Sequence, residues 1–176
     1  MTVNFFRSAV LIIALPVVQT PVIAQERQST MSQLPSTGAP LKSITIHQEV
    51  DFKASPERLY EILLDSNQFS EFSAQSSEFS AKSAQIDRAV GGAFSLFDGH
   101  IVGRNIELIP NQRIVQAWRV VDWPAGVYSI VKFELKSQGS GTHLVFDHTG
   151  FPEKWRDHLA AGWQSHYWDL LTRYLR

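Results

Sequence analysis

The sequence from residue 148 to residue 176 reads HTGFPEKWRDHLAAGWQSHYWDLLTRYLR, and it predicts a long helix that decides the fold. Pro152 suits a first helical turn, where its missing N–H would have no partner. Glu153 then places a negative charge near the positive end of the helix dipole. At 100° per residue, one face collects a mainly apolar stripe: Trp155, Leu159, Gly162, Trp163, His166, Leu170 and Tyr174. Such a stripe needs a large apolar surface to lie on.

Two positions of this helix carry further expectations. Gly162 costs helix stability, about 1 kcal/mol relative to alanine, so we expect a sheet backbone or a ligand to approach closely there. Trp168 falls opposite the stripe. It is therefore expected to pack against small helices or a linker, or to mark a contact surface.

The composition is that of one ordinary globular domain. The chain has 176 residues, of which 44% are hydrophobic, and this length suits one domain better than two. A net charge of -1 argues against a nucleic-acid partner, which would require a basic stripe. The absence of cysteine excludes disulfides, thiolate metal sites and a cysteine nucleophile.

The first 24 residues predict a signal peptide. Arg7 precedes the apolar run AVLIIALPVV at residues 9–18, which is too short to span a bilayer. Small or aliphatic residues follow, and we expect cleavage between Ala24 and Gln25. An uncleaved N-terminal anchor is the less favoured alternative.

A polar segment follows and predicts a flexible linker over residues 25–41, because it contains prolines and a glycine but no apolar period. The folded domain is expected over residues 42–176. The signal peptide places the mature protein in the periplasm or outside the cell, with no membrane span in the mature chain.

The rest of the domain predicts a sheet with two helices inserted after its first strand. Apolar and polar residues alternate over 43–52, and Ser55 and Pro56 then begin a helix as N-cap and first residue. A second short helix is expected over 67–74. Period-two alternation between turn residues then predicts strands over 78–85, 93–98, 100–109, 113–121, 127–137 and 142–149. This order predicts an α+β fold, in which a curved antiparallel sheet of six to seven strands wraps the long C-terminal helix.

Several short motifs, in their order and spacing, give the chain a family resemblance. They are Gly91-Gly92-Ala93-Phe94, Gly103, Leu108-Ile109-Pro110, Ile114 to Trp118, Gly141-Thr142, His148-Thr149-Gly150 and Gly162-Trp163. The set resembles the bacterial stand-alone form of the family named for the activator of the 90 kDa heat shock protein ATPase. That family lies in the START-like (SRPBCC), or helix-grip, superfamily, and the resemblance covers residues 43–175.

The resemblance implies a fold and three functions. It implies a helix-grip fold with two small helices after the first strand. Superfamily members typically bind apolar or amphipathic molecules between sheet and helix, and some are cyclases or dehydratases. The namesake function is that of a co-chaperone with a protein partner.

The candidate ligand site lies between the predicted sheet and helix. Strand alternation directs His148 into this gap, and the helix presents His166 to it. The expected ligand-binding residues are His100, Arg104, Trp118, His148, Trp155, Gly162, Trp163 and His166. Alternatively, each histidine is a hydrogen-bonded core residue, the tryptophans are core, and Arg104 faces outward.

Other chemistry finds little support in the sequence. The histidines lack ligand spacing such as HExxH, and no nucleophile elbow or cofactor fingerprint appears. We therefore expect no metal, no cofactor and no catalytic residue. The favoured function is binding of a small apolar or amphipathic molecule. The alternatives are a cyclase or dehydratase that uses the histidines or Arg104, and a protein-interaction module anchored by Trp123 in the loop 122–126.

Overall fold

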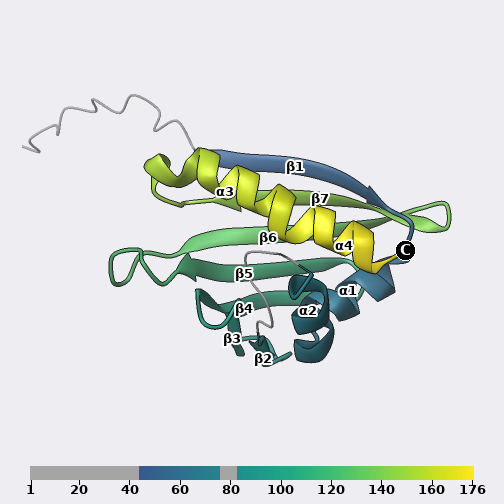
Figure 1. The fold of residues 1–176 in the computed structure, drawn as a ribbon, viewed down its shortest axis with the longest axis horizontal. Helices are drawn as coiled ribbons and strands as arrows, with labels where there is room; N and C mark the ends of the chain where they lie inside the picture. Colours follow the sequence, from purple (N-terminus) through teal and green to yellow (C-terminus); the bar gives the residue numbers. More distant parts are fainter. Residues whose placement is uncertain (1–43, 76–82) are drawn as a thin grey trace, which may run out of the picture. The chain divides into compact units, whose positions relative to one another are not determined.

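A computed structural model describes residues 44–75 and 83–176, and these residues form one antiparallel sheet with a long C-terminal helix across it (Figure 1). The strand order is β1-β7-β6-β5-β4-β3-β2. The strands are β1 (Thr45–Phe52), β2 (Gln85–Ile86), β3 (Ala93–Leu96), β4 (Ile101–Ile109), β5 (Arg113–Val120), β6 (Ser129–Gln138) and β7 (Gly141–Thr149). The predicted helix-grip α+β architecture is confirmed. Most of the predicted strand 78–85 lies outside the described residues, as do the predicted signal peptide and linker.

The two short helices follow β1 as predicted. Helix α1 (Pro56–Leu64) begins after Ser55, whose hydroxyl accepts a hydrogen bond of 3.2 Å from the Arg58 N–H. Helix α2 (Ser66–Ser73) begins after Asp65, whose carboxylate accepts from the Gln68 N–H at 2.9 Å. Each cap satisfies a helix N–H that has no partner within its helix. Helix α1 therefore begins at the predicted residue, and α2 begins one residue before its predicted range of 67–74.

The C-terminal helix is continuous over 22 residues, but it is not a uniform α-helix. It comprises a 3₁₀ turn η1 (Glu153–Trp155), α3 (Arg156–Trp163), a π-helical segment η2 (Gln164–Trp168) and α4 (Asp169–Tyr174). In the π segment the Asp169 N–H donates to the carbonyl of Gln164, five residues earlier. The uniform helix that the sequence predicted is therefore interrupted by one wider turn.

The π segment changes which side chains meet the sheet. In a regular α-helix, side chains five residues apart diverge by about 140°, yet Trp163 and Trp168 stack with ring centroids 5.9 Å apart and planes at 21°. Trp168 is 1% exposed, and its indole N–H donates to the Gln48 side chain on β1 at 2.7 Å. The expectation that Trp168 lies opposite the buried stripe is wrong.

The inner face of the sheet is apolar, as its alternation predicted. Phe133, Phe146 and Trp163 form an aromatic cluster between β6, β7 and the helix, with Phe146 and Trp163 centroids 4.3 Å apart. Gly103 on β4 permits close packing against the neighbouring strands β3 and β5. A Cβ at this position would overlap the Ala117 carbonyl and the Phe94 ring. Within residues 44–75 and 83–176, no helix is long and apolar enough to cross a bilayer.

Candidate functional site

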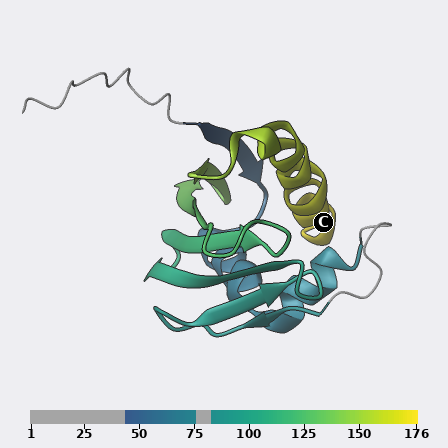
Figure 2. The same ribbon diagram turned by 90° about the vertical axis from the view of Figure 1, so that its left-hand side faces the viewer.

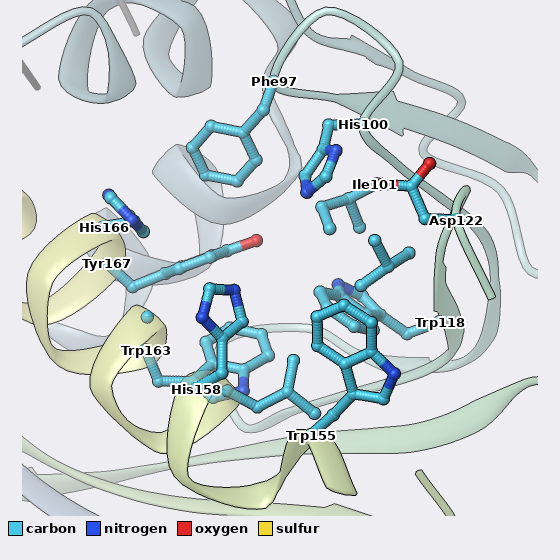
Figure 3. Close-up of a pocket in the computed structure, with 13 residues that line it drawn as sticks. Phe97, His100, Ile101, Trp118, Asp122, Trp155, His158, Trp163, His166 and Tyr167 are labelled. Carbon is cyan, nitrogen blue, oxygen red and sulfur yellow. The ribbon is translucent and has the colours of Figure 1, made fainter. Parts of the chain in front are cut away.

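A cavity of about 370 Å³ lies between the C-terminal helix and strands β4 and β5. The helix runs along the concave side of the sheet (Figure 2). The turn before β4 and the residues after β5 complete the walls, and Figure 3 shows the lining side chains converging from these elements. The predicted sheet–helix gap therefore contains space for a small molecule.

The cavity floor is apolar and largely aromatic. Its seven members are all buried: Phe97, Ile101, Trp118, Val120, Leu159, Trp163 and Tyr167. Aromatic side chains of this kind offer a large, rigid apolar surface. The floor therefore favours a flat or compact apolar ligand body.

The cavity rim is more polar and more exposed. It consists of His100, Asp122, Trp155, His158, Gly162 and His166. Asp122 and His158 are exposed, whereas the other four are half-buried. An apolar floor beneath a polar rim is the usual construction of a site for an amphipathic molecule.

Gly162 adds space to the rim. A Cβ built at this position would meet only the Cδ2 atom of His166, at 3.8 Å, which is ordinary van der Waals contact. No sheet backbone lies within 4 Å of that Cβ, so the predicted close approach of the sheet is wrong. The remaining alternative, that Gly162 makes room for a ligand, agrees with its place in the cavity lining.

His148 lies beneath the cavity rather than in it. The Trp163 indole N–H donates to its Nδ1 at 3.0 Å, so its Nε2 carries the proton and donates to the Ser129 hydroxyl at 2.7 Å. Ser129 in turn donates to the Trp118 carbonyl at 2.9 Å. His148 is fully buried, and burial lowers its pKa to about 3, so the ring is neutral. This chain of hydrogen bonds links two residues of the cavity floor, Trp118 and Trp163.

The structure brings six of the eight predicted ligand residues to the cavity: His100, Trp118, Trp155, Gly162, Trp163 and His166. His148 is the hydrogen-bonded core residue of the alternative interpretation. Arg104 is exposed, and its guanidinium donates to the Gly91 carbonyl at 2.8 Å. The expectation that Arg104 points into the gap is wrong. It assumed that His100 and Arg104 lie on the same face of one strand, but His100 precedes β4 in a turn and does not share the alternation of that strand.

Sequence reasoning missed several lining residues. Tyr167 stands in the π segment, but on a regular wheel it falls close to Tyr174 of the stripe, which was a usable signal. On a regular wheel His158 falls at the edge of the helical stripe, which is a usable signal for its place on the rim. Asp122 follows the end of β5, where no periodicity constrains a side chain.

The protein-interaction alternative loses its expected anchor. Trp123 is 3% exposed and packs edge-on against Trp118, with centroids 5.8 Å apart. The expectation of an exposed Trp123 is wrong. In the part of the chain that the structure describes, no group of three His, Asp or Glu side chains is arranged to hold a metal ion.

Comparison with known proteins agrees with this fold. The chain is 26% identical over 158 residues to the human "Activator of 90 kDa heat shock protein ATPase homolog 1", a match that covers 88% of this chain and 45% of that protein. The chain thus spans less than half the length of the curated relatives it matches first. Those relatives therefore extend beyond the region that the match covers.

Solved structures show the same architecture. An HSP90 activator from Plasmodium falciparum superposes with a TM-score of 0.62 at 27% identity, covering 70% of this chain and 90% of that one. A protein from Chromobacterium violaceum gives 0.60 at 26% identity, covering 76% and 98%. The family model described as "Activator of Hsp90 ATPase homolog 1-like protein" matches residues 53–176. The chain therefore belongs to the activator of Hsp90 ATPase homolog 1-like family, within the helix-grip superfamily.

Proposed function

We propose that this domain binds a small apolar or amphipathic molecule in the cavity between its sheet and its C-terminal helix. The observation that carries the proposal is the cavity itself, about 370 Å³ with a buried aromatic floor and a histidine-rich rim. A core packed for stability alone leaves few voids larger than a water molecule. Gly162 supports the same function, since it gives up helix propensity without packing against the sheet.

We further propose that the protein acts after export, as the predicted signal peptide over residues 1–24 suggests. The ligand would then be met in the periplasm or outside the cell. N-terminal sequencing of the exported protein tests this, and a first residue other than Gln25 would contradict the proposed cleavage site.

The binding proposal is tested by narrowing the cavity from Gly162. Gly162→Leu directs a branched side chain into the cavity, so we expect binding of 1-anilinonaphthalene-8-sulfonate to weaken at least about tenfold. Gly162→Ala is the matched control, because its Cβ makes only ordinary contact with His166. Alanine should keep the affinity and raise stability by up to about 1 kcal/mol.

The readouts are probe fluorescence and the thermal midpoint of unfolding. Equal probe affinity in the leucine and alanine variants, both folded, would contradict a binding cavity at Gly162. Independently of these variants, native mass spectrometry of the exported wild-type protein identifies any small molecule that it retains.

A second candidate function is activation of a chaperone ATPase, which the printed names of the relatives suggest. It is favoured by the family membership but not by the loop 122–126, whose tryptophan is buried. Stimulation of a 90 kDa heat shock protein ATPase by the purified domain would support it. A third candidate, an enzyme of the cyclase or dehydratase type, would use the rim histidines His100, His158 and His166 with Asp122 as proton donors and acceptors.

A further inference from the structure

Tyr167 is a tightly packed polar side chain of the cavity floor. It belongs to the π segment, and its ring lies 4.3 Å from Trp163, 5.6 Å from Phe97 and 5.8 Å from Phe69, centroid to centroid. The side chain is 5% exposed. A phenol packed among three rings from three segments cannot redirect its hydroxyl group easily, so the oxygen has a fixed place.

That hydroxyl points into the cavity. Figure 3 shows the Tyr167 ring extending from the helix, with its oxygen directed toward the side of Ile101 and Trp118. Among the described residues the hydroxyl forms no hydrogen bond of ordinary geometry. A buried tyrosine hydroxyl usually has a hydrogen-bond partner, so this donor awaits one.

The protonation of the Tyr167 hydroxyl follows from its surroundings. Burial raises the pKa of Tyr167, and the Trp118 indole, which lies near enough to act as a donor to the phenol oxygen, partly offsets that rise. The phenol therefore stays protonated, and its O–H remains a donor. What remains for a ligand is the O–H donor.

We propose that the cavity takes molecules with an apolar body and a neutral oxygen acceptor, such as a ketone carbonyl, which the Tyr167 hydroxyl binds at the floor. The inference rests on the proposed binding function and deepens it. The floor contains no cationic side chain to neutralise an anion, which favours a neutral acceptor at that depth. Any charged group of the ligand would instead lie at the rim, beside the histidines and Asp122.

The π segment gives this donor its position. The wider turn brings both Tyr167 and Trp168 to the buried side of the helix, where Tyr167 faces the cavity and Trp168 faces Phe146. π-helical turns are frequent at functional sites, where they reorient one side chain without breaking the helix. The same wider turn therefore serves both the core and the cavity.

The test compares two matched ligands on the full chain. 2-Acetylnaphthalene carries a ketone carbonyl where 2-ethylnaphthalene carries a methylene group, and the two have the same ring body. Quenching of tryptophan fluorescence gives both dissociation constants. We expect the wild type to prefer the ketone by about tenfold, and Tyr167→Phe to bind the two equally.

A phenol elsewhere on the helix supplies the control. Tyr174 donates to Glu71 at 2.6 Å and does not line the cavity, so Tyr174→Phe should keep the tenfold preference. The carbonyl infrared band of bound 2-acetylnaphthalene should shift to lower frequency in the wild type and in Tyr174→Phe. In Tyr167→Phe it should return to its position in an apolar solvent.

The outcomes separate this inference from the function it rests on. If the wild type binds neither naphthalene, the binding function itself is overturned. If it binds both with equal affinity, the cavity is a binding site but Tyr167 does not select an acceptor. A ketone preference that survives in Tyr167→Phe assigns the donor to another residue and overturns the inference.

Discussion

The two faces of β7 use the same residue type in opposite ways. His143 points outward, and its Nδ1 donates to the Asp51 carboxylate of β1 at 2.8 Å. His148 points inward, is fully buried and forms hydrogen bonds only with uncharged groups, the Trp163 indole and the Ser129 hydroxyl. Burial and neighbours, rather than the imidazole itself, decide whether a histidine here belongs to a charged network or to a neutral core.

The outer face is a ladder of charged contacts across neighbouring strands. His47 donates to Asp147 at 2.7 Å, and Lys132 lies 3.0 Å from the same carboxylate. Lys132 also pairs with Glu134, and Arg113 of β5 contacts Glu107 at 2.7 Å. These pairs are solvent-exposed to various degrees, so each is expected to add little to stability.

The inner face depends instead on one satisfied chain of neutral hydrogen bonds. The hydrogen bonds run in one direction, from the Trp163 indole through His148 and Ser129 to the Trp118 carbonyl. Loss of a member would leave a buried donor or acceptor without a partner, which costs more than the bond itself contributes. Replacing a side chain of the outer face should therefore cost little stability, whereas replacing a member of the inner hydrogen-bond chain should cost much more.

The largest expected effect is the loss of the inner histidine. His148→Ala leaves the Trp163 N–H without an acceptor and opens a void, so we expect the free energy of unfolding to fall by about 3 kcal/mol. His143→Ala, on the outer face of the same strand, should change it by no more than about 0.5 kcal/mol. Urea denaturation of both variants measures the contrast. Equal losses would show that the two faces do not differ in the way described.

The second expected effect is a dependence of stability on pH. Folding lowers the pKa of His148 from 6.5 to about 3 through burial. Below pH 6.5 the unfolded chain therefore binds a proton at this residue that the folded chain does not. Stability should fall with decreasing pH by up to about 1.4 kcal/mol per unit over this window.

The variant His148→Gln lacks the titrating group, so its stability should fall less steeply between pH 6.5 and 4.5. His47 acts in the opposite direction, because its hydrogen bonds to Asp147 and then Glu49 raise its pKa. Its contribution is present below pH 6.5 and fades as the pH rises through the raised value. An unchanged slope in His148→Gln would assign the acid sensitivity to other groups.

Much of the fold was predictable because its signals are local. Alternation predicted the strands that became β5, β6 and β7 and the inward direction of His148, and Ser55 with Pro56 predicted the start of α1. The α+β order then followed from element lengths and turns. These signals depend on nearest neighbours in the chain, so no knowledge of tertiary contacts was needed.

The errors fall where tertiary contacts override local periodicity. The π turn brings Trp168 onto the sheet, and no sequence pattern announces it. Trp123 directly precedes the turn residues Pro124 to Gly126, yet it is buried against Trp118. Tyr167, one of the site residues that sequence reasoning missed, lies in the same π turn, and its role depends on a hydroxyl that faces the cavity.

The smallest expected effect concerns the outer ladder. Although burial raises the pKa of Asp147, hydrogen bonds from His47 and Lys132 lower it below its ordinary value. The attraction is therefore real, but both partners remain in contact with water, with side-chain exposures of 34% for Lys132 and 25% for Asp147. A double-mutant cycle of Lys132→Ala and Asp147→Ala should give a coupling energy below about 1 kcal/mol. In about 1 M salt, where the screening length is about 3 Å, the coupling should fall further. A coupling above about 2 kcal/mol that resists salt would mean that this outer pair behaves as a buried one, and the contrast between the two faces would then lie in geometry rather than in solvent exposure.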